Sequence, residues 1–129
     1  MKANKLSLEQ LGRVSIEEFR NQRKTAVTVI LDDIRSALNV GSFFRTCDGL
    51  AIEKLYLCGI TAKPPHKEIL KTAIGATSSV EWEYRDSITS LIQELSPNNS
   101  IIAIEQTDKS IPLNKLANRN FIKNPLVLI

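Results

Sequence analysis

The hydrophobic positions change their spacing along this chain, and the changes predict alternating strands and helices. Short runs that are almost uniformly apolar are typical of strands buried on both faces of a sheet. The run at 26–31 is of this kind, the runs at 54–58, 101–104 and 126–129 predict three further strands, and the alternating run at 80–84 is typical of a strand near a sheet edge. Apolar residues at helical spacing predict helices over 6–24, 40–51, 66–73 and 86–95, with a short helical turn over 111–116.

Strands that alternate with helices predict an α/β fold, here a parallel, doubly wound sheet with a further helix at the N-terminus. In such sheets, ligands bind beyond the carboxyl ends of the strands. The loops in which we expect a site are therefore 32–39, 59–66 and 105–110.

Charge is unevenly distributed over the 129 residues. Residues 1–24 contain six Lys or Arg and three Glu, so they carry the whole net charge of +3, while the other residues balance to zero. A basic segment attached to a neutral body is compatible with contacts to phosphate backbones. The same composition also suits a solvated helix face, so charge alone leaves both interpretations open.

Several classes of protein are disfavoured by the sequence. No apolar run approaches the roughly 20 residues of a membrane-spanning helix, and the first residues lack the apolar stretch of a secretory signal. We therefore expect a cytoplasmic protein with no membrane partner. Cys47 and Cys58 sit in apolar segments, where free cysteines behave as small hydrophobic side chains. With His66 as the single histidine and no CxxC pair, no metal site is expected.

The densest group of chemically useful residues follows the first predicted strand and opens the next predicted helix, from Asn39 to Thr46. Asn39 stands where an N-cap is expected, and Gly41 would let backbone N–H groups approach an anion. Arg45 lies about two turns into the helix, away from the apolar stripe, where its guanidinium could hold a phosphate. The alternative interpretation is an ordinary capped helix that carries a surface arginine.

The pattern Asn39-x-Gly41-Ser42-x-x-Arg45-Thr46 after a buried strand resembles the first signature motif of the SpoU/TrmH branch of the SPOUT methyltransferases. Four other segments are also similar to that family, namely 31–39, 48–57, 74–77 and 102–107. The resemblance implies transfer of a methyl group from S-adenosylmethionine to a ribose 2′-hydroxyl of tRNA or rRNA. The complete protein is then expected to be a homodimer.

The resemblance also assigns residues to the reaction. Arg45 matches the family's arginine at the reactive nucleotide, where electrostatic positioning of a phosphate or alkoxide is the safer role, because arginine rarely gives up its proton. Asn39 matches the asparagine that supports this catalytic site. The residues expected to contact RNA are Asn39, Gly41, Ser42, Arg45, Arg13 and Arg20.

The loop after the fourth predicted strand matches part of the family's donor pocket, although an ordinary strand-to-helix loop would also account for it. The residues expected to contact the methyl donor are Ile104, Glu105, Gln106, Thr107 and Ile129. The chain then divides into a basic N-terminal helical arm, 1–24, and an incomplete methyltransferase domain, 25–129.

The last residues, 126–129, stand where the second, glycine-rich motif of the family would begin, and no glycine follows Gly75. We therefore expect a SPOUT-like α/β knot fold truncated before the trefoil knot, with most of the S-adenosylmethionine pocket beyond Ile129. Such a chain would be inactive by itself. A non-catalytic RNA-binding module is the alternative function, and a domain for protein association is a third.

Three ring-bearing side chains admit two interpretations each. His66 suits a general base on chemical grounds, but the start of a surface helix is the simpler explanation. Trp82 and Tyr84 share one side of a strand and could stack on bases, although packing at a sheet edge explains them as well.

Overall fold

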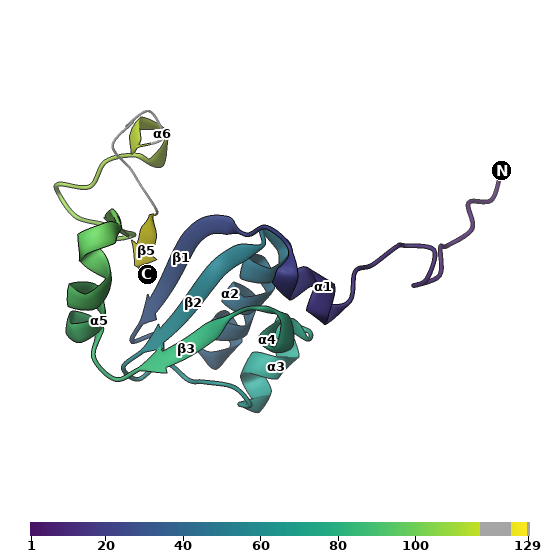
Figure 1. The fold of residues 1–129 in the computed structure, drawn as a ribbon, viewed down its shortest axis with the longest axis horizontal. Coiled ribbons are helices and arrows are strands. Elements are labelled where there is room, and N and C mark those ends of the chain that lie inside the picture. Colours follow the sequence, from purple (N-terminus) through teal and green to yellow (C-terminus); the bar gives the residue numbers. More distant parts are fainter. Residues whose placement is uncertain (117–124, 129) are drawn as a thin grey trace.

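The computed structural model describes residues 1–116 and 125–128, and it confirms an α/β fold around a five-stranded parallel sheet (Figure 1). The strands are β1 (Thr25–Asp32), β2 (Ile52–Cys58), β3 (Trp82–Arg85), β4 (Ile101–Ala103) and β5 (Leu126–Leu128). The helices are α1 (Ile16–Asn21), α2 (Ala37–Gly49), α3 (Lys67–Ala73), α4 (Ala76–Ser79), α5 (Ile88–Leu95), η1 (Ser96–Asn98) and α6 (Leu113–Leu116). Within these described ranges, no helix has the length and apolar character required to span a membrane.

The strand order is β3-β2-β1-β5-β4, so the chain builds outward from β1 to β3 and then crosses to the other side of β1. Asp32, at the end of β1, is opposite Cys58, at the end of β2. On the other side of β1, Leu128 pairs with both Ile30 and Ala103. Because the strands are parallel, the loops that follow β1, β2 and β4 leave the same edge of the sheet, where sites are expected.

Helices cover both faces of the sheet, which confirms the doubly wound arrangement (Figure 1). On one face, a large cluster joins β1 and β2 to α2, α3 and α4; its completely buried members include Leu31, Leu55, Leu57, Val40 and Phe44. On the opposite face, a smaller cluster joins the same two strands to α5; it consists of Ile30, Tyr56, Cys58 and Leu91. Burial on both faces explains why β1 and β2 are almost uniformly apolar.

The N-terminal segment differs from the helix predicted over 6–24. The structure has a helix only at α1, where Ser15 and Glu18 form the capping box that their spacing indicates. The preceding residues contain only a turn at 8–12, and the leucines of this turn are exposed. This segment extends away from the sheet (Figure 1). Helical spacing was not sufficient here because most helical stability comes from packing an apolar face.

The loops after β1 and β2 are tied together at the carboxyl edge of the sheet. Thr61 is buried, and its hydroxyl donates to the carbonyl oxygen of Leu31 at 3.2 Å and accepts the N–H of Ile34 at 3.0 Å. A carboxylate oxygen of Asp33 accepts the N–H of Ile60 at 2.9 Å. These bonds fix the backbone just before α2, and they therefore help to define where that helix begins.

Candidate functional site

The start of α2 differs from the sequence-based prediction. Its N-cap is Ser36, whose hydroxyl oxygen accepts the N–H of Asn39 at 3.2 Å, so Asn39 is not the N-cap. The cause is physical: the hydrogen bond between Ile34 and Thr61 fixes the backbone ahead of Ser36, and serine caps a helix as well as asparagine does. The side chain of Asn39 is instead exposed on the first turn of the helix.

The predicted site residues of α2 lie on different sides of this helix. Asn39 and Ser42 line a pocket of about 390 Å³ together with Phe43 and Thr46. Arg45 follows Asn39 by six residues, which at ~100° per residue turns it roughly 120° away around the helix axis. The structure therefore brings Asn39 and Ser42 together, but it does not bring Asn39 and Arg45 into one pocket.

Gly41 is buried and faces α3. A Cβ at this position would overlap Oγ1 of Thr72 and the carbonyl oxygen of Ile69. Thr72 also donates to the carbonyl oxygen of Leu38 at 2.7 Å, which ties the two helices together at this close approach. The predicted contact of Gly41 with RNA therefore finds no accessible surface, and the structure gives this glycine a role in helix packing instead.

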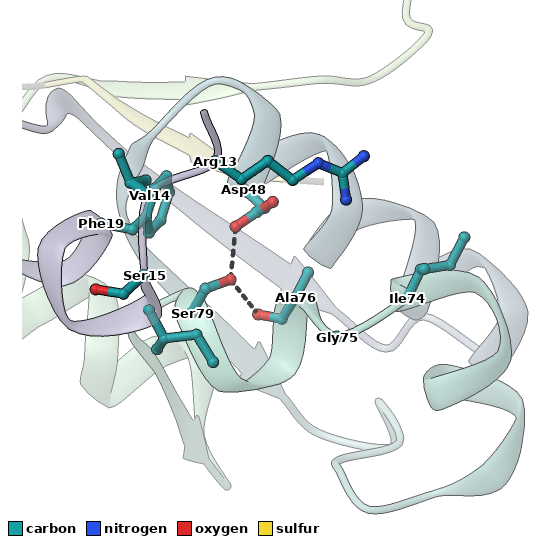
Figure 2. Close-up of a pocket in the computed structure, with 10 residues that line it drawn as sticks. Arg13, Val14, Ser15, Phe19, Asp48, Ile74, Gly75, Ala76 and Ser79 are labelled. Atoms are coloured by element: carbon teal, nitrogen blue, oxygen red, sulfur yellow. Dashed lines mark hydrogen bonds between the residues drawn. The ribbon is translucent and has the colours of Figure 1, made fainter. Parts of the chain in front are cut away.

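Arg45 and Asp48 are three residues apart, so they are neighbours on the surface of α2. Arg45 is exposed, and its guanidinium has no hydrogen bond or salt bridge within the part of the chain that the structure describes. Asp48 lines a pocket of about 420 Å³ between α1, α2 and α4, and Arg13 lines the same pocket (Figure 2). One oxygen of Asp48 accepts the hydroxyl of Ser79 at 2.5 Å. An exposed cation and a pocket with a carboxylate thus occupy neighbouring positions on α2.

Arg20, the other predicted RNA contact of the N-terminal segment, is engaged within the protein. Its guanidinium donates to the carbonyl oxygen of Ser78 at 2.5 Å and so docks α1 on α4. Lys24 donates to the carbonyl oxygen of Phe19 at 2.5 Å, and its ammonium lies 3.4 Å from the centre of that ring. Partial burial lowers the pKa of Lys24, and the nearby Asp48 carboxylate opposes this change. A contact between RNA and Arg20 would therefore compete with an intramolecular hydrogen bond.

The residues predicted to bind the methyl donor follow β4, at the carboxyl edge of the sheet. Ile104, Glu105 and Thr107 line a pocket of about 700 Å³. Its other walls are Ile102, Ala103, Lys109, Ser110, Ile111, Leu113 and Leu116. Gln106 belongs to the same loop but does not line this pocket, and Ile129 lies outside the described residues. Apolar walls with a few polar groups are the usual composition of small-molecule sites.

The cysteine thiols take no part in this arrangement. Burial raises the pKa of Cys47 and of Cys58 to about 11, so both thiols are protonated and unreactive at neutral pH.

Burial, together with the neighbouring charge of Asp33, also raises the pKa of the Asp32 carboxyl group. Among residues 1–116 and 125–128, no three His, Cys, Asp or Glu side chains come together in a way that could hold a metal ion.

The three ring-bearing side chains have structural partners. His66 caps α3, because its Nδ1 accepts the N–H of Glu68 at 3.2 Å, and the surface-helix interpretation is confirmed. Trp82 packs edge-on against Phe44 with ring centres 6.0 Å apart. Tyr84 donates its hydroxyl to the carbonyl oxygen of Gly59 at 2.8 Å. Both aromatic residues lie on the edge strand β3, as edge packing predicts.

Sequence reasoning missed the pocket that contains Asp48. Its lining comes from three separate stretches, around residues 13–19, at Asp48 and at 74–79, and no local pattern joins them. The one signal available in advance was the spacing of three between Arg45 and Asp48, which places a carboxylate beside the predicted catalytic arginine.

Comparisons with known proteins agree with this fold. The sequence model described as the SpoU rRNA Methylase family matches residues 26–129, which include all of α2 and every strand of the described sheet except the first residue of β1. The fold is that of the SPOUT methyltransferases. The chain belongs to the SpoU rRNA Methylase family. No curated protein sequence matches it.

Three solved structures illustrate the likeness in fold. A TrmH/SpoU tRNA modifying enzyme from A. aeolicus has a TM-score of 0.72 at 19% identity, over 88% of this chain and 56% of that one. An AdoMet-bound rRNA methyltransferase from Sinorhizobium meliloti has a TM-score of 0.66 at 19% identity, over 85% of this chain and 41% of that one. The SpoU methyltransferase AviRb from Streptomyces viridochromogenes, in complex with AdoMet, has a TM-score of 0.64 at 19% identity, over 87% of this chain and 45% of that one. The chain thus spans about half the length of these structures.

Proposed function

We propose that this protein transfers a methyl group from S-adenosylmethionine to a ribose 2′-hydroxyl of tRNA or rRNA. The observation that carries the proposal is the family match over residues 26–129, which contains the whole segment from Asn39 to Thr46. The solved neighbours support it, because they are described as a tRNA modifying enzyme and as methyltransferases with AdoMet bound. From the same family we propose that the complete protein acts in the cytoplasm as a homodimer.

Arg45 is the residue to which we assign the reacting nucleotide. A ribose hydroxyl is a poor nucleophile, so its proton must leave and its oxygen must be aligned with the methyl group. An exposed guanidinium without an intramolecular partner among the described residues can hold the RNA phosphate bidentately. It can also stabilise the negative charge that develops on the oxygen.

The pocket after β4 is the part of this chain that we assign to the methyl donor. S-adenosylmethionine, when bound, supplies a methyl group on a sulfonium that is already an activated leaving group. The residues present suit one portion of such a molecule, because Ile104 provides an apolar wall and Glu105 an exposed carboxylate for hydroxyl groups. Thr107 completes the loop that would hold it.

The test is methyl transfer by the purified complete protein to tRNA and rRNA that lack ribose methylation, with radiolabelled S-adenosylmethionine. Arg45→Ala should lower the rate by about 100-fold or more, the usual effect of losing an electrostatic stabiliser, while donor affinity and the free energy of unfolding stay unchanged. Lys71→Ala is the matched control, because Lys71 is an exposed cation outside the proposed site. It should leave the rate as it is.

The position of the methyl group decides between ribose and base. Alkali cleaves RNA through the 2′-hydroxyl, so a 2′-O-methylated nucleotide should appear in an alkali-resistant dinucleotide. Label in mononucleotides would instead indicate methylation of a base. RNA binding without any transfer would favour the alternative function, a non-catalytic RNA-binding module, and an Arg45→Ala rate close to that of the wild type would remove the role assigned to this arginine.

A further inference from the structure

The pocket between α1, α2 and α4 is not used by the proposed methyl transfer, and its composition indicates a ligand of its own. Figure 2 shows Ile74 on one side of it and Val14 on the other, with the carboxylate of Asp48 between them. Val14 and Ile74 are 57% and 65% exposed, so the two apolar walls are open to solvent. A volume of about 420 Å³ is within the range of small-molecule sites.

Asp48 gives this pocket a specific hydrogen-bonding character. A carboxylate has two oxygens with about four acceptor positions. Ser79 occupies one of them, because its hydroxyl donates to Oδ1 at 2.5 Å, and it also donates to the carbonyl oxygen of Ala76 at 3.3 Å. Among the residues described, no other hydrogen bond reaches the carboxylate oxygens of Asp48. The site can therefore accept two further N–H groups from a flat ligand held between the apolar walls.

The surroundings favour a nucleic acid as the source of that ligand. Arg13 extends above Asp48 toward the Ile74 side of the pocket (Figure 2), and its guanidinium is available for a phosphate. Residues 1–24, which build this side of the pocket, carry a net charge of +3. A carboxylate repels phosphates but can accept N–H groups from the pairing edge of an unstacked base, and single-stranded RNA is recognised through such edges.

The pocket also has the right position relative to the proposed reaction. Arg45 and Asp48 are separated by three residues of α2, so their side chains start about 5–6 Å apart on the same part of the surface. A nucleotide whose ribose lies at Arg45 would therefore bring the base of a neighbouring nucleotide within reach of Asp48.

We propose that this pocket binds an unpaired guanine next to the methylated nucleotide, with the Asp48 carboxylate accepting the N1–H and the 2-amino group. Guanine is the base whose pairing edge presents two adjacent donors. Adenine and cytosine place an acceptor beside their amino group, and uracil flanks its single N–H with two carbonyl oxygens, so each would face the carboxylate with a repulsive atom. The inference rests on the proposed function, because it assumes an RNA substrate at Arg45.

The experiment measures binding of the full chain to short oligo(U) strands that carry one central guanosine, inosine, adenosine or cytidine. Fluorescence anisotropy at low salt gives each dissociation constant. The guanosine strand should bind about tenfold more tightly than the all-uridine strand, as expected for hydrogen bonds to a charged acceptor. Inosine lacks the 2-amino group and should fall between them.

Three variants separate the proposed role of Asp48 from a structural one. Asp48→Asn keeps an acceptor for Ser79 but faces guanine with a donor, and it should abolish the preference for guanosine. Ser79→Ala removes the internal hydrogen bond yet keeps the carboxylate, so the preference should survive. Glu17→Gln removes an exposed carboxylate of α1 that does not line the pocket, and it should change nothing.

Each result has a definite meaning. A wild-type protein that binds all strands equally, or an Asp48→Asn protein that keeps the guanosine preference, overturns the guanine pocket and leaves the methyltransferase proposal intact. If the protein binds none of the strands and neither tRNA nor rRNA, the guanine pocket and the methyltransferase proposal are both overturned. Arg13→Ala should weaken all strands by a similar factor and lower the salt dependence by about one phosphate contact.

Discussion

The two edges of the sheet are built from different kinds of residues. At the β3 edge, charged side chains form a connected network: Lys54 lies 3.1 Å from Glu81 and 3.5 Å from Glu83, and Arg85 lies 2.6 Å from Glu83 and 3.0 Å from Glu94. At the β4 edge, the strand Ile101–Ala103 has no charged residue. Charged side chains protect an edge strand from pairing with other chains, so β3 is suited to be a solvent-exposed edge of the sheet.

The same contrast extends into the helices behind each edge. Every buried side chain for which burial is described lies between Val29 and Leu91. After β4, large apolar side chains remain on the surface, with Ile104 at 54% and Leu113 at 72% exposure. The residues from Val29 to Leu91, which include β3, therefore carry the stability of the fold. The residues from β4 onward offer an apolar surface of the kind that marks interaction sites.

Removing apolar contacts on each side should give the largest difference. Leu91→Ala empties a completely buried position in the cluster under α5 and should lower the free energy of unfolding by about 2–5 kcal/mol. Leu113→Ala, on the β4 side, should change it by less than about 0.5 kcal/mol. Denaturant unfolding of both variants measures the contrast. Equal losses would mean that the β4 side is as well packed as the β3 side.

Adding a single methyl group tests how tightly the β3 side is packed. Gly41→Ala should cost about 1–3 kcal/mol, because the new Cβ meets Thr72 and the backbone of Ile69. Gly49→Ala is the matched control in the same helix, since nothing lies within 4 Å of a Cβ there. It should be neutral or stabilise by up to about 1 kcal/mol. A tolerated Gly41→Ala would show that α2 and α3 can separate at little cost.

Acid should weaken the charged edge, with the smallest effect of the three. The hydrogen bond from Arg85 lowers the pKa of the half-buried Glu83 carboxylate below its ordinary 4.5, and further charges contribute. A carboxyl group with a lowered pKa in the folded state adds stability above pH 4.5 and loses it as the pH falls through the lowered value. Arg85→Gln should therefore flatten the pH dependence of unfolding in this acid range. Glu53→Gln, an exposed residue outside the network, should not.

Much of the fold was predictable because burial on both faces leaves uniform apolar runs at β1 and β2. The helix predicted over 6–24 was wrong because of tertiary context. The stripe of Leu8 and Leu11 has helical spacing, but nothing lies beside it to pack against. The run at β4 looks as apolar as β1, yet its strand lies at the edge of the sheet in the described structure. Periodicity reports which face is apolar, and it does not report whether something covers that face.

The site was predictable only where it is local. The spacing of Asn39, Ser42 and Arg45 was readable along one helix, but the helix turns Arg45 away from Asn39, and Arg45 does not line the pocket that Asn39 and Ser42 share. The helix α4 was missed because four residues after Gly75 give no periodic signal. The pocket at Asp48 was missed for a related reason, since its walls meet only after the chain has folded.

The two free cysteines lie in different layers of the molecule. Cys47 belongs to the cluster under α2, α3 and α4, and Cys58 belongs to the cluster under α5. Neither thiol reacts while it is buried, so alkylation by a maleimide or iodoacetamide has to wait until the covering helices move aside. In two variants that each keep one cysteine, the rate of alkylation would therefore report separately on the opening of each face of the sheet.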